Sequence, residues 1–283
     1  MFPIDKMSKV LQVSRSGYYY WLNSEPSHRT LENGELTVEI RAIHARSKQT
    51  YGSPRITAEL NAENKKASRP RVARLMKKAG IRSKMTKKYR VSTTDSNHGF
   101  HIAPNLLDRD FKVGEIGKVW VSDITYIPTA QGWLYLTTVI DLGDRKVIGW
   151  ALSITMKAVD TTVAAWKMAV INRPITSNLI FHSDRGVQYA CTAFTNLVKA
   201  YTTVTRSMSR KGNCWDNAVA ESFFKSMKSE WTKWHRYLSF KQAKLSVFEY
   251  IETWYNVNRR HSALNYMTPI EYYYFLQTRN LAA

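Results

Sequence analysis

The sequence predicts an α/β core in which helices cover a mixed β-sheet, with an all-α region before the core and a helical segment after it. Between residues 118 and 156, β-branched and aromatic runs alternate with turn residues, as in three consecutive strands. Farther along, stretches with helical periodicity alternate with short apolar runs. A three-strand meander followed by alternating helix and strand predicts a mixed sheet with helices packed on it.

The charge of the chain is its strongest global feature. The 283 residues carry a formal net charge of +20, and the first 100 residues hold 20 Lys or Arg against eight Asp or Glu. So uneven a balance favours a polyanionic partner over general solubility. The two cysteines, Cys191 and Cys214, lack the CxxC spacing of a structural zinc site, and we expect a reducing, cytoplasmic location. The longest apolar run is too short to span a bilayer.

Composition divides the chain into five predicted segments. They are a short helical segment (1–30), a helix-turn-helix-like region (31–90), a linker (91–114), the α/β core (115–235) and C-terminal helices packed on the core (236–283). The length suffices for two or three modest domains and one substantial core.

The first segment is predicted to be a helix, a turn and a helix over Met7 to Leu22, with Ser14 or Ser16 capping the second helix. Such a unit has either a binding role or a simple packing role. Glu25 to Gly34 has the composition of a linker, and helical spacing resumes at Leu36.

The next region predicts two short helices. Ser53 is expected to cap the first, with Pro54 at the first helical position. The second is expected to open near Ser68 and to end at Gly80.

The second of these helices lies in a run of basic residues. From Lys65 to Arg90 there are twelve basic residues and no acidic residue, and so many like charges repel one another unless a polyanion neutralises them. We therefore favour a helix-turn-helix DNA-binding unit over a merely solvated face. Its expected DNA contacts are Arg71, Arg74, Lys77 and Lys78.

The polar stretch from Tyr89 to Asp110 predicts an interdomain linker. It contains His98 and His101, whose separation suits two metal ligands. No Cys or carboxylate in ligand spacing accompanies them, so a zinc site is disfavoured.

The core is predicted to contain five strands and three helices, the last of which carries Glu221. The strands are expected at Val119–Ile127, Trp133–Ile140, Lys146–Ile154, Asn178–Phe181 and near Val204, and the first two helices at 159–171 and 192–200. Two capping-box patterns, Ser239 to Gln242 and Thr268 to Glu271, predict C-terminal helices over 240–258 and 269–277.

Three acids of the core are candidate metal ligands. Asp123 lies in the middle of a predicted strand, where an acid is costly unless it binds something. Asp184 follows the fourth strand, where a turn role is equally open, and Glu221 lies one turn inside a predicted helix. Carboxylates from a sheet and a helix are the hard-oxygen ligands that Mg²⁺ or Mn²⁺ requires.

Other acids of the core are expected to be structural. Asp216 lies five residues before Glu221 and therefore on a different helical face, and either it or Asn217 suits the N-cap. Asp141 and Asp144 resemble turn acids, with Asp141 as the second choice for the site.

Several cations are expected to contact the DNA backbone. Lys225 and Lys228 follow Glu221 by four and seven residues and so share its helix face. Arg210 and Lys211 flank Gly212 and have either the same role or a solvated surface role. A packing role and a catalytic role are equally open for His182.

Multi-residue motifs lie in order along nearly the whole chain. They are Asp123 to Trp150 (with Gly132-Trp133-Leu134-Tyr135-Leu136, Val139-Ile140-Asp141-Leu142 and Ile148-Gly149-Trp150), His182-Ser183-Asp184, Ser207 to Cys214, and Tyr255-Asn256 with Arg259-Arg260-His261-Ser262. Together they resemble the OrfB product of insertion-sequence transposases of the third family. Members of that family are integrase-like enzymes with an Asp, Asp, Glu active site.

The resemblance implies an RNase H-like (retroviral integrase-like) catalytic core, with Asp123, Asp184 and Glu221 as catalytic acids that hold two Mg²⁺ ions, for which Mn²⁺ substitutes. It implies DNA strand cleavage and joining at element ends, a homo-oligomer on paired ends, an OrfA partner or fusion, and a place at the bacterial nucleoid. Between Asp184 and Glu221 lie 36 residues, one more than in the family pattern, and we expect the extra residue at Ala200 to Thr205. The sequence has no heptad zipper, so it is expected to be the catalytic portion of such a fusion.

Three other functions remain open on sequence grounds. A DNA-binding regulator without catalysis would need the basic N-terminal third of the chain, but it would not need an acid in the middle of a strand at Asp123. A nuclease of the same fold cleaves without joining. An inactive remnant of a mobile element is disfavoured by the intact acids.

Overall fold

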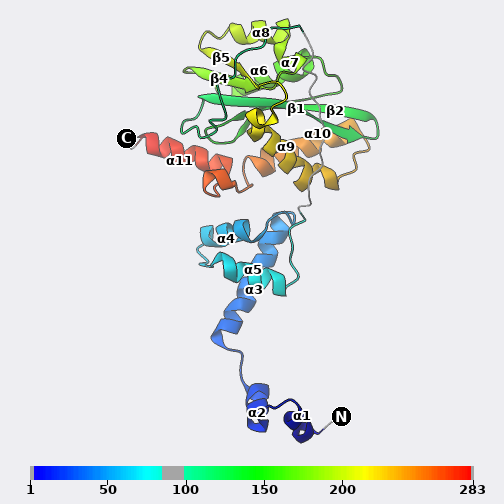
Figure 1. Cartoon of the computed structure of the whole chain (residues 1–283), viewed down its shortest axis with the longest axis vertical. Helices are drawn as coiled ribbons and strands as arrows, with labels where there is room; N and C mark the ends of the chain where they lie inside the picture. The colour runs from blue at the N-terminus through cyan, green and yellow to red at the C-terminus, as the bar shows by residue number, and fades with distance from the viewer. Residues whose placement is uncertain (1–2, 85–98, 282–283) are drawn as a thin grey trace. The chain divides into compact units, whose positions relative to one another are not determined.

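A computed structural model of the chain describes residues 3–84 and 99–281. The chain forms two compact units, Met1–Ser83 and Lys84–Ala283 (Figure 1). His98 and the end of the basic run, residues 85–90, lie outside the described residues. No helix in the described part of the chain is both long and apolar enough to cross a membrane.

The first unit is helical. It contains α1 (Ile4–Val10), α2 (Arg15–Asn23), α3 (His28–Arg46), α4 (Ser53–Ala62) and α5 (Arg69–Lys78). Ser14 caps α2 as predicted, because its Oγ accepts a hydrogen bond from the Gly17 amide at 2.9 Å. The helices α3, α4 and α5 pack around Ile40, Ile56 and Val72, which are fully buried.

Two local predictions in this unit are wrong. The expected linker from Glu25 to Gly34 is largely the first turns of α3, because Ser27 caps that helix by accepting from the Thr30 amide. Gly52 rather than Ser53 is the N-cap of α4, so Ser53 already lies in the helix. The predicted end of α5 is confirmed, since Gly80 adopts a φ of +68°, a conformation that glycine allows at low cost.

The second unit is built on a mixed five-stranded sheet. Its strands are β1 (Val119–Thr129), β2 (Gly132–Asp141), β3 (Val147–Ser153), β4 (Leu179–Ser183) and β5 (Val204–Met208). The spatial order is β3-β2-β1-β4-β5, with β1, β2 and β3 antiparallel and β1, β4 and β5 parallel. The predicted meander and the predicted mixed sheet are confirmed.

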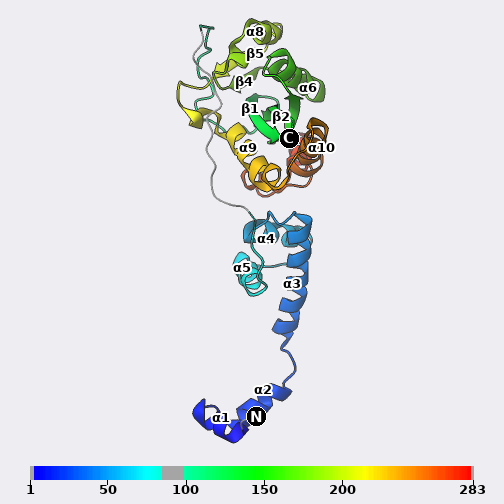
Figure 2. The ribbon, with the colours of Figure 1, turned by 90° about the vertical axis from the view of Figure 1, so that its right-hand side faces the viewer.

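Helices cover both faces of this sheet (Figures 1 and 2). On one face lie α6 (Ala164–Asn172) and α8 (Thr192–Lys199), and on the other α9 (Ala218–Glu230) and α10 (Phe240–Phe248). The remaining helical segments are η1 (Val159–Val163), α7 (Val187–Ala190), η2 (Cys214–Asn217), η3 (Thr232–Trp234), η4 (Glu249–Tyr255), η5 (Ser262–Leu264) and α11 (Pro269–Leu281). Two predicted helices contain a π-helical stretch, η1 before α6 and η4 after α10.

An aromatic cluster fills the space between the sheet and α6 and α8. The ring of Trp166 lies 5.6 Å from that of Trp120 and 5.0 Å from that of Phe181, and Phe194 lies 5.5 Å from Phe181. These four side chains are at most 2% exposed. Burial of this much aromatic surface provides a rigid base for the strands that carry the candidate acids.

Asp141 and Asp144 are structural acids, as expected for turn residues. Arg173, which follows α6, donates to Asp141 Oδ2 and to Asp144 Oδ2, each at 2.6 Å. Both carboxyls are fully buried. Asp141, the second choice for the site, is therefore committed to an ion pair.

The two edges of the sheet are partly covered. At β5, the Met208 amide donates to the Pro104 carbonyl, and Ser207 Oγ accepts from the Leu106 amide at 2.9 Å. At β3, the side-chain amide of Asn256 accepts from the Val147 amide at 2.9 Å and donates to the Val147 carbonyl at 3.0 Å. The side-chain amide of Asn256 thus makes the two backbone hydrogen bonds with Val147 that a neighbouring strand would make.

Candidate active site

The three candidate acids come from three adjacent elements. Asp123 lies in the middle of β1, Asp184 follows the last residue of β4, and Glu221 lies in the first turn of α9. The parallel pairing of β1 and β4 sets Ser122 beside Ser183, so Asp123 and Asp184 follow at the same level of the sheet. The helix α9 packs on β1 and carries Glu221 on that side of the sheet.

The charges of the three carboxyls act on one another. Burial raises the pKa of Asp123 well above its ordinary value, and the negative charges of Asp184 and Glu221 raise it further. The pKa of Glu221 is also raised, first by burial and then by Asp184. Like charges that share one region disfavour their ionised forms, so these acids are a functional-site candidate.

The three carboxyls do not form a finished metal cage. Within residues 3–84 and 99–281, no three His, Cys, Asp or Glu side chains are placed so that they could hold a metal ion together. The negative charges of Asp184 and Glu221 nevertheless raise the pKa of Asp123, and the charge of Asp184 raises the pKa of Glu221. The acids therefore influence one another's ionisation. Their chemistry suits a hard divalent cation, because its positive charge would offset the repulsion between the carboxylates.

Lys228 lies beside this acidic region. Burial lowers the pKa of its ammonium, and the neighbouring carboxylate of Asp123 opposes that shift. The Lys228 Nζ lies 4.7 Å from the centre of the Tyr126 ring, which fixes the side chain by a cation–π contact. Lys225, one turn earlier, is exposed to solvent.

Asn217 ties α9 to β1. Its buried side chain donates from Nδ2 to the carbonyl oxygen of Ser122 at 3.0 Å, directly before Asp123. The Oγ of Ser122 in turn pairs with the hydroxyl of Tyr189 at 2.7 Å. This contact, which the sequence did not reveal, couples the start of the helix of Glu221 to the strand of Asp123.

Asp216 is structural as predicted, but it does not cap α9. Its fully buried carboxylate accepts from the Arg109 Nε at 2.9 Å and from the backbone amide and guanidinium of Arg210 at 2.8–2.9 Å. Hydrogen bonds from the Arg210 guanidinium hold the pKa of this carboxyl well below its usual range. Arg210 thus pairs with Asp216 although its side chain is 47% exposed, and Lys211 is exposed as well.

We expect Asp216→Asn to destabilise the second unit by about 2 kcal/mol at pH 7, because Arg109 and Arg210 lose the charge of their buried acceptor. A carboxyl with a depressed folded-state pKa stabilises the fold above its unfolded pKa and loses that contribution as pH falls through the folded value. The difference in free energy of unfolding between variant and wild type should therefore become smaller below about pH 4. Urea unfolding from pH 3 to 8 measures it, and a difference independent of pH would contradict the ion-pair role.

His182 is a packed side chain in this structure. It is fully buried, and its ring nitrogens lie 2.8 Å from Ser207 Oγ and 3.2 Å from Ser209 Oγ. Burial lowers its pKa to about 4. These contacts join β4 to β5 just before Asp184.

The predicted DNA contacts of the first unit divide into two kinds. Arg71 donates to Asn33 Oδ1 and Glu32 Oε2, each at 2.8 Å, and so links α5 to α3. Arg74, Lys77 and Lys78 are exposed on α5.

Comparison with known families agrees with this division of the chain. Residues 31–89 match the family described as HTH-like domain, and residues 115–214 and 202–269 match two families described as Integrase core domain. Together with the strand order, these matches define the second unit as an integrase-type core of the RNase H-like fold.

Full-length relatives give a narrower assignment. The chain is 40% identical over 93% of its length to the insertion element IS600 uncharacterized 31 kDa protein of Shigella sonnei, covering 96% of that protein. It is 38% identical over 99% of its length to the transposase InsF for insertion sequence IS3A of Escherichia coli, again covering 96% of the relative. The chain belongs to this family, the transposases of IS3-type insertion sequences.

Solved structures match more distantly. The catalytic core domain of BIV integrase is 16% identical with a TM-score of 0.40, covering 58% of this chain and 99% of that chain. At this TM-score the match adds nothing to the fold assignment, which rests on the strand order and the family matches.

Proposed function

We propose that this transposase cleaves DNA strands at insertion-sequence ends and joins them to target DNA with Asp123, Asp184 and Glu221 as its catalytic acids. The observation that carries the proposal is the position of these acids on β1, directly after β4 and in the first turn of α9. The family supplies the reaction class, and the raised pKa values of Asp123 and Glu221 support the choice of residues.

The three carboxylates would hold divalent metal, with Mg²⁺ as the expected ion, Mn²⁺ as a substitute and two ions per site. Metal bound there supplies Lewis acidity that activates a water or 3′-hydroxyl and stabilises the leaving oxygen. Asp123 on β1 and Asp184 directly after β4 would provide oxygen ligands, and Glu221 would provide its ligand from α9. The Asn217 to Ser122 hydrogen bond keeps these two elements in register.

Lys225 and Lys228 offset the charge of the phosphate backbone near these acids. Both follow Glu221 on α9, and the charge interaction of Lys228 with Asp123 and its cation–π contact with Tyr126 support this role. Lys211 extends the basic surface beyond β5, while Arg210 holds Asp216. The protein acts as a homo-oligomer on paired ends, with an OrfA product as partner or fusion.

The central experiment compares wild type with Glu221→Gln on labelled element-end DNA in Mg²⁺ or Mn²⁺. We expect wild type to nick and join the DNA, whereas the variant binds DNA with unchanged affinity but does neither. Gln keeps the size of the side chain and removes the charge that a cation needs. Nicking without joining by wild type would instead identify a nuclease, and binding without either reaction a regulator.

A second experiment tests the basic helix of the first unit. Lys77→Gln with Lys78→Gln should weaken DNA binding and reduce the slope of log affinity against log salt by about two, one for each lost phosphate contact. Arg74→Ala should act likewise, whereas Arg71→Ala should also loosen α5 from α3, because Arg71 pairs with Glu32. Lys241→Gln with Lys244→Gln, on α10, is the charge-matched control. If both double variants have the same slope of log affinity against log salt, α5 does not contact DNA.

A further inference from the structure

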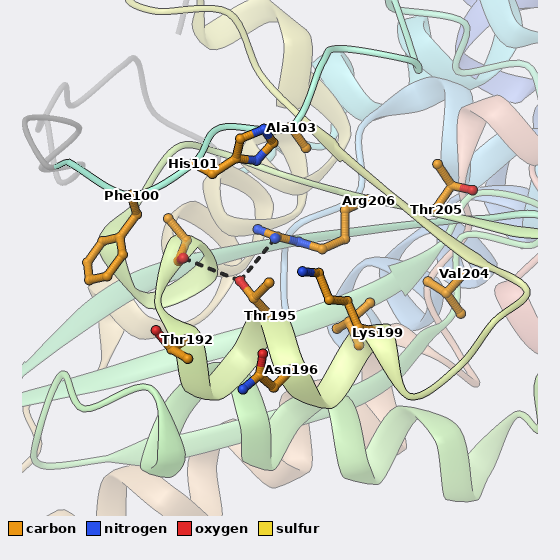
Figure 3. A pocket seen from close by; sticks show the side chains of 12 residues that line it. Phe100, His101, Ala103, Thr192, Thr195, Asn196, Lys199, Val204, Thr205 and Arg206 are labelled. Carbon is orange, nitrogen blue, oxygen red and sulfur yellow. Dashed lines mark hydrogen bonds between the residues drawn. The ribbon is translucent and has the colours of Figure 1, made fainter.

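A cavity of about 630 Å³ lies in the second unit between α8, the first half of β5 and residues 100–103 (Figure 3). Its volume is in the range typical of ligand sites. None of the three candidate acids lines it. We refer to it as the α8–β5 cavity.

The charged residues that line the α8–β5 cavity are both cations, Lys199 and Arg206. Three of its lining residues are His101, Lys199 and Arg206, and none is Asp or Glu. Figure 3 shows that these side chains come from three separate elements and reach into the same space. Cationic groups around one cavity repel each other unless an anion lies between them.

Arg206 is held in place by neutral groups only. Its Nη1 donates to Thr195 Oγ1 at 3.0 Å, and its Nη2 donates to the Tyr189 carbonyl at 2.7 Å. Burial lowers the pKa of its guanidinium, and no carboxylate in the described part of the chain opposes that shift.

A guanidinium has five N–H donors in a rigid fork. The Nε donor of Arg206 makes no hydrogen bond to the described residues. Lys199 is exposed at the mouth, and Thr192 and Asn196 add polar groups from α8. A fixed guanidinium with spare donors, an ammonium and an imidazole match a phosphate group, which accepts charge-assisted hydrogen bonds.

We propose that the α8–β5 cavity is an anion subsite that takes a backbone phosphate of DNA away from the catalytic acids. DNA as the source of the phosphate rests on the proposed function, whereas the anion chemistry of the cavity does not. The subsite would hold a segment of DNA against β5 and α8 while another segment lies at the acids.

The first arm of the test uses inorganic pyrophosphate with the full-length protein, without DNA or divalent metal. Pyrophosphate should raise the melting temperature of wild type, and Lys199→Glu should weaken its binding at least tenfold. Lys241→Glu, the matched reversal of an exposed lysine on α10, should bind as wild type does. Arg206→Gln should also lose binding, and Lys199→Glu keeps the test valid if that variant folds poorly. Equal stabilisation of wild type, Lys199→Glu and Lys241→Glu would overturn the subsite.

The second arm measures the salt dependence of binding to element-end DNA. Lys199→Gln should reduce the slope of log affinity against log salt by about one relative to Lys241→Gln. Loss of pyrophosphate binding with an unchanged DNA slope would overturn the DNA assignment, since the cavity would then take a free phosphate compound. Because neither arm requires strand cleavage, failure here is distinguishable from failure of the proposed catalytic acids.

Discussion

Asp123→Asn is expected to lower metal-dependent strand cleavage by about a thousandfold or more, since the variant loses a charged oxygen ligand in the middle of the sheet. The measurement is single-turnover nicking of labelled element-end DNA in Mg²⁺. DNA affinity without metal should change little, because the basic residues remain. Asp110→Asn, which changes an exposed acid of the same unit, is the matched control and should retain wild-type rates.

The same substitution should raise the stability of the metal-free protein. The pKa of Asp123 is raised in the folded state, so the folded protein binds more protons than the unfolded chain and loses stability as pH rises from the unfolded toward the folded pKa. Asn removes this cost, and at pH 7 the free energy of unfolding should rise by about 1 kcal/mol or more. The free energy of unfolding of wild type should approach that of the variant as pH falls.

In the presence of Mg²⁺, wild type should have a larger free energy of unfolding than Asp123→Asn. A ligand at a hundred times its dissociation constant stabilises the folded state by about 2.7 kcal/mol, and the variant should lose most of this gain. An Asp123→Asn protein that cleaves at the wild-type rate, or that gains as much stability from Mg²⁺ as wild type, would exclude Asp123 as a metal ligand.

Arg259→Met is expected to destabilise the second unit by about 3–5 kcal/mol, the largest effect on stability that we predict. Arg259 donates to both oxygens of Glu230 at 2.6–2.7 Å, and both side chains are nearly or fully buried. The substitution leaves the Glu230 carboxylate buried without its countercharge. Eight of the nine tryptophans lie in this unit, so urea unfolding followed by tryptophan fluorescence reports on it.

A double variant separates loss of the pair from loss of packing. Glu230→Met combined with Arg259→Met removes both charges and should recover most of the lost stability, because a buried ion pair replaced by apolar groups is often neutral. If the double variant is as unstable as Arg259→Met alone, the cost comes from packing around Arg259. Since Glu230 ends α9, loosening of this pair should also lower cleavage through the position of Glu221.

The regular part of the fold was predictable because it depends on local periodicity. The five strands begin and end close to the predicted residues, and the mixed sheet covered by helices was predicted, whereas the strand order was not. The π-helical stretches η1 and η4 were missed because they keep nearly the same apolar spacing as an α-helix. The start of α3 was missed because Ser27 and Pro26 suit a linker and a helix N-terminus equally well.

Among the candidate acids, Asp123 was selected from the sequence because an acid in the middle of a strand is costly, whereas the choice of Asp184 depended on the family resemblance. The surroundings of these acids were not predictable, since they depend on partners that are distant in sequence. Asp216 pairs with Arg109 across 107 residues, and Asn217 reaches Ser122 across 95. No local pattern indicates that Arg210 pairs with the buried Asp216 or that Arg206 lines a cavity.

The hydrogen bonds at both margins of the sheet bear on how several copies can assemble. The Asn256 amide occupies the Val147 backbone at one margin, and residues 104–106 engage Ser207 and Met208 at the other. Strand-to-strand joining between protomers is disfavoured where these positions are already engaged. If copies assemble on two DNA ends as proposed, they are therefore expected to meet through helical surfaces or through the DNA itself, which leaves the central sheet of each copy intact.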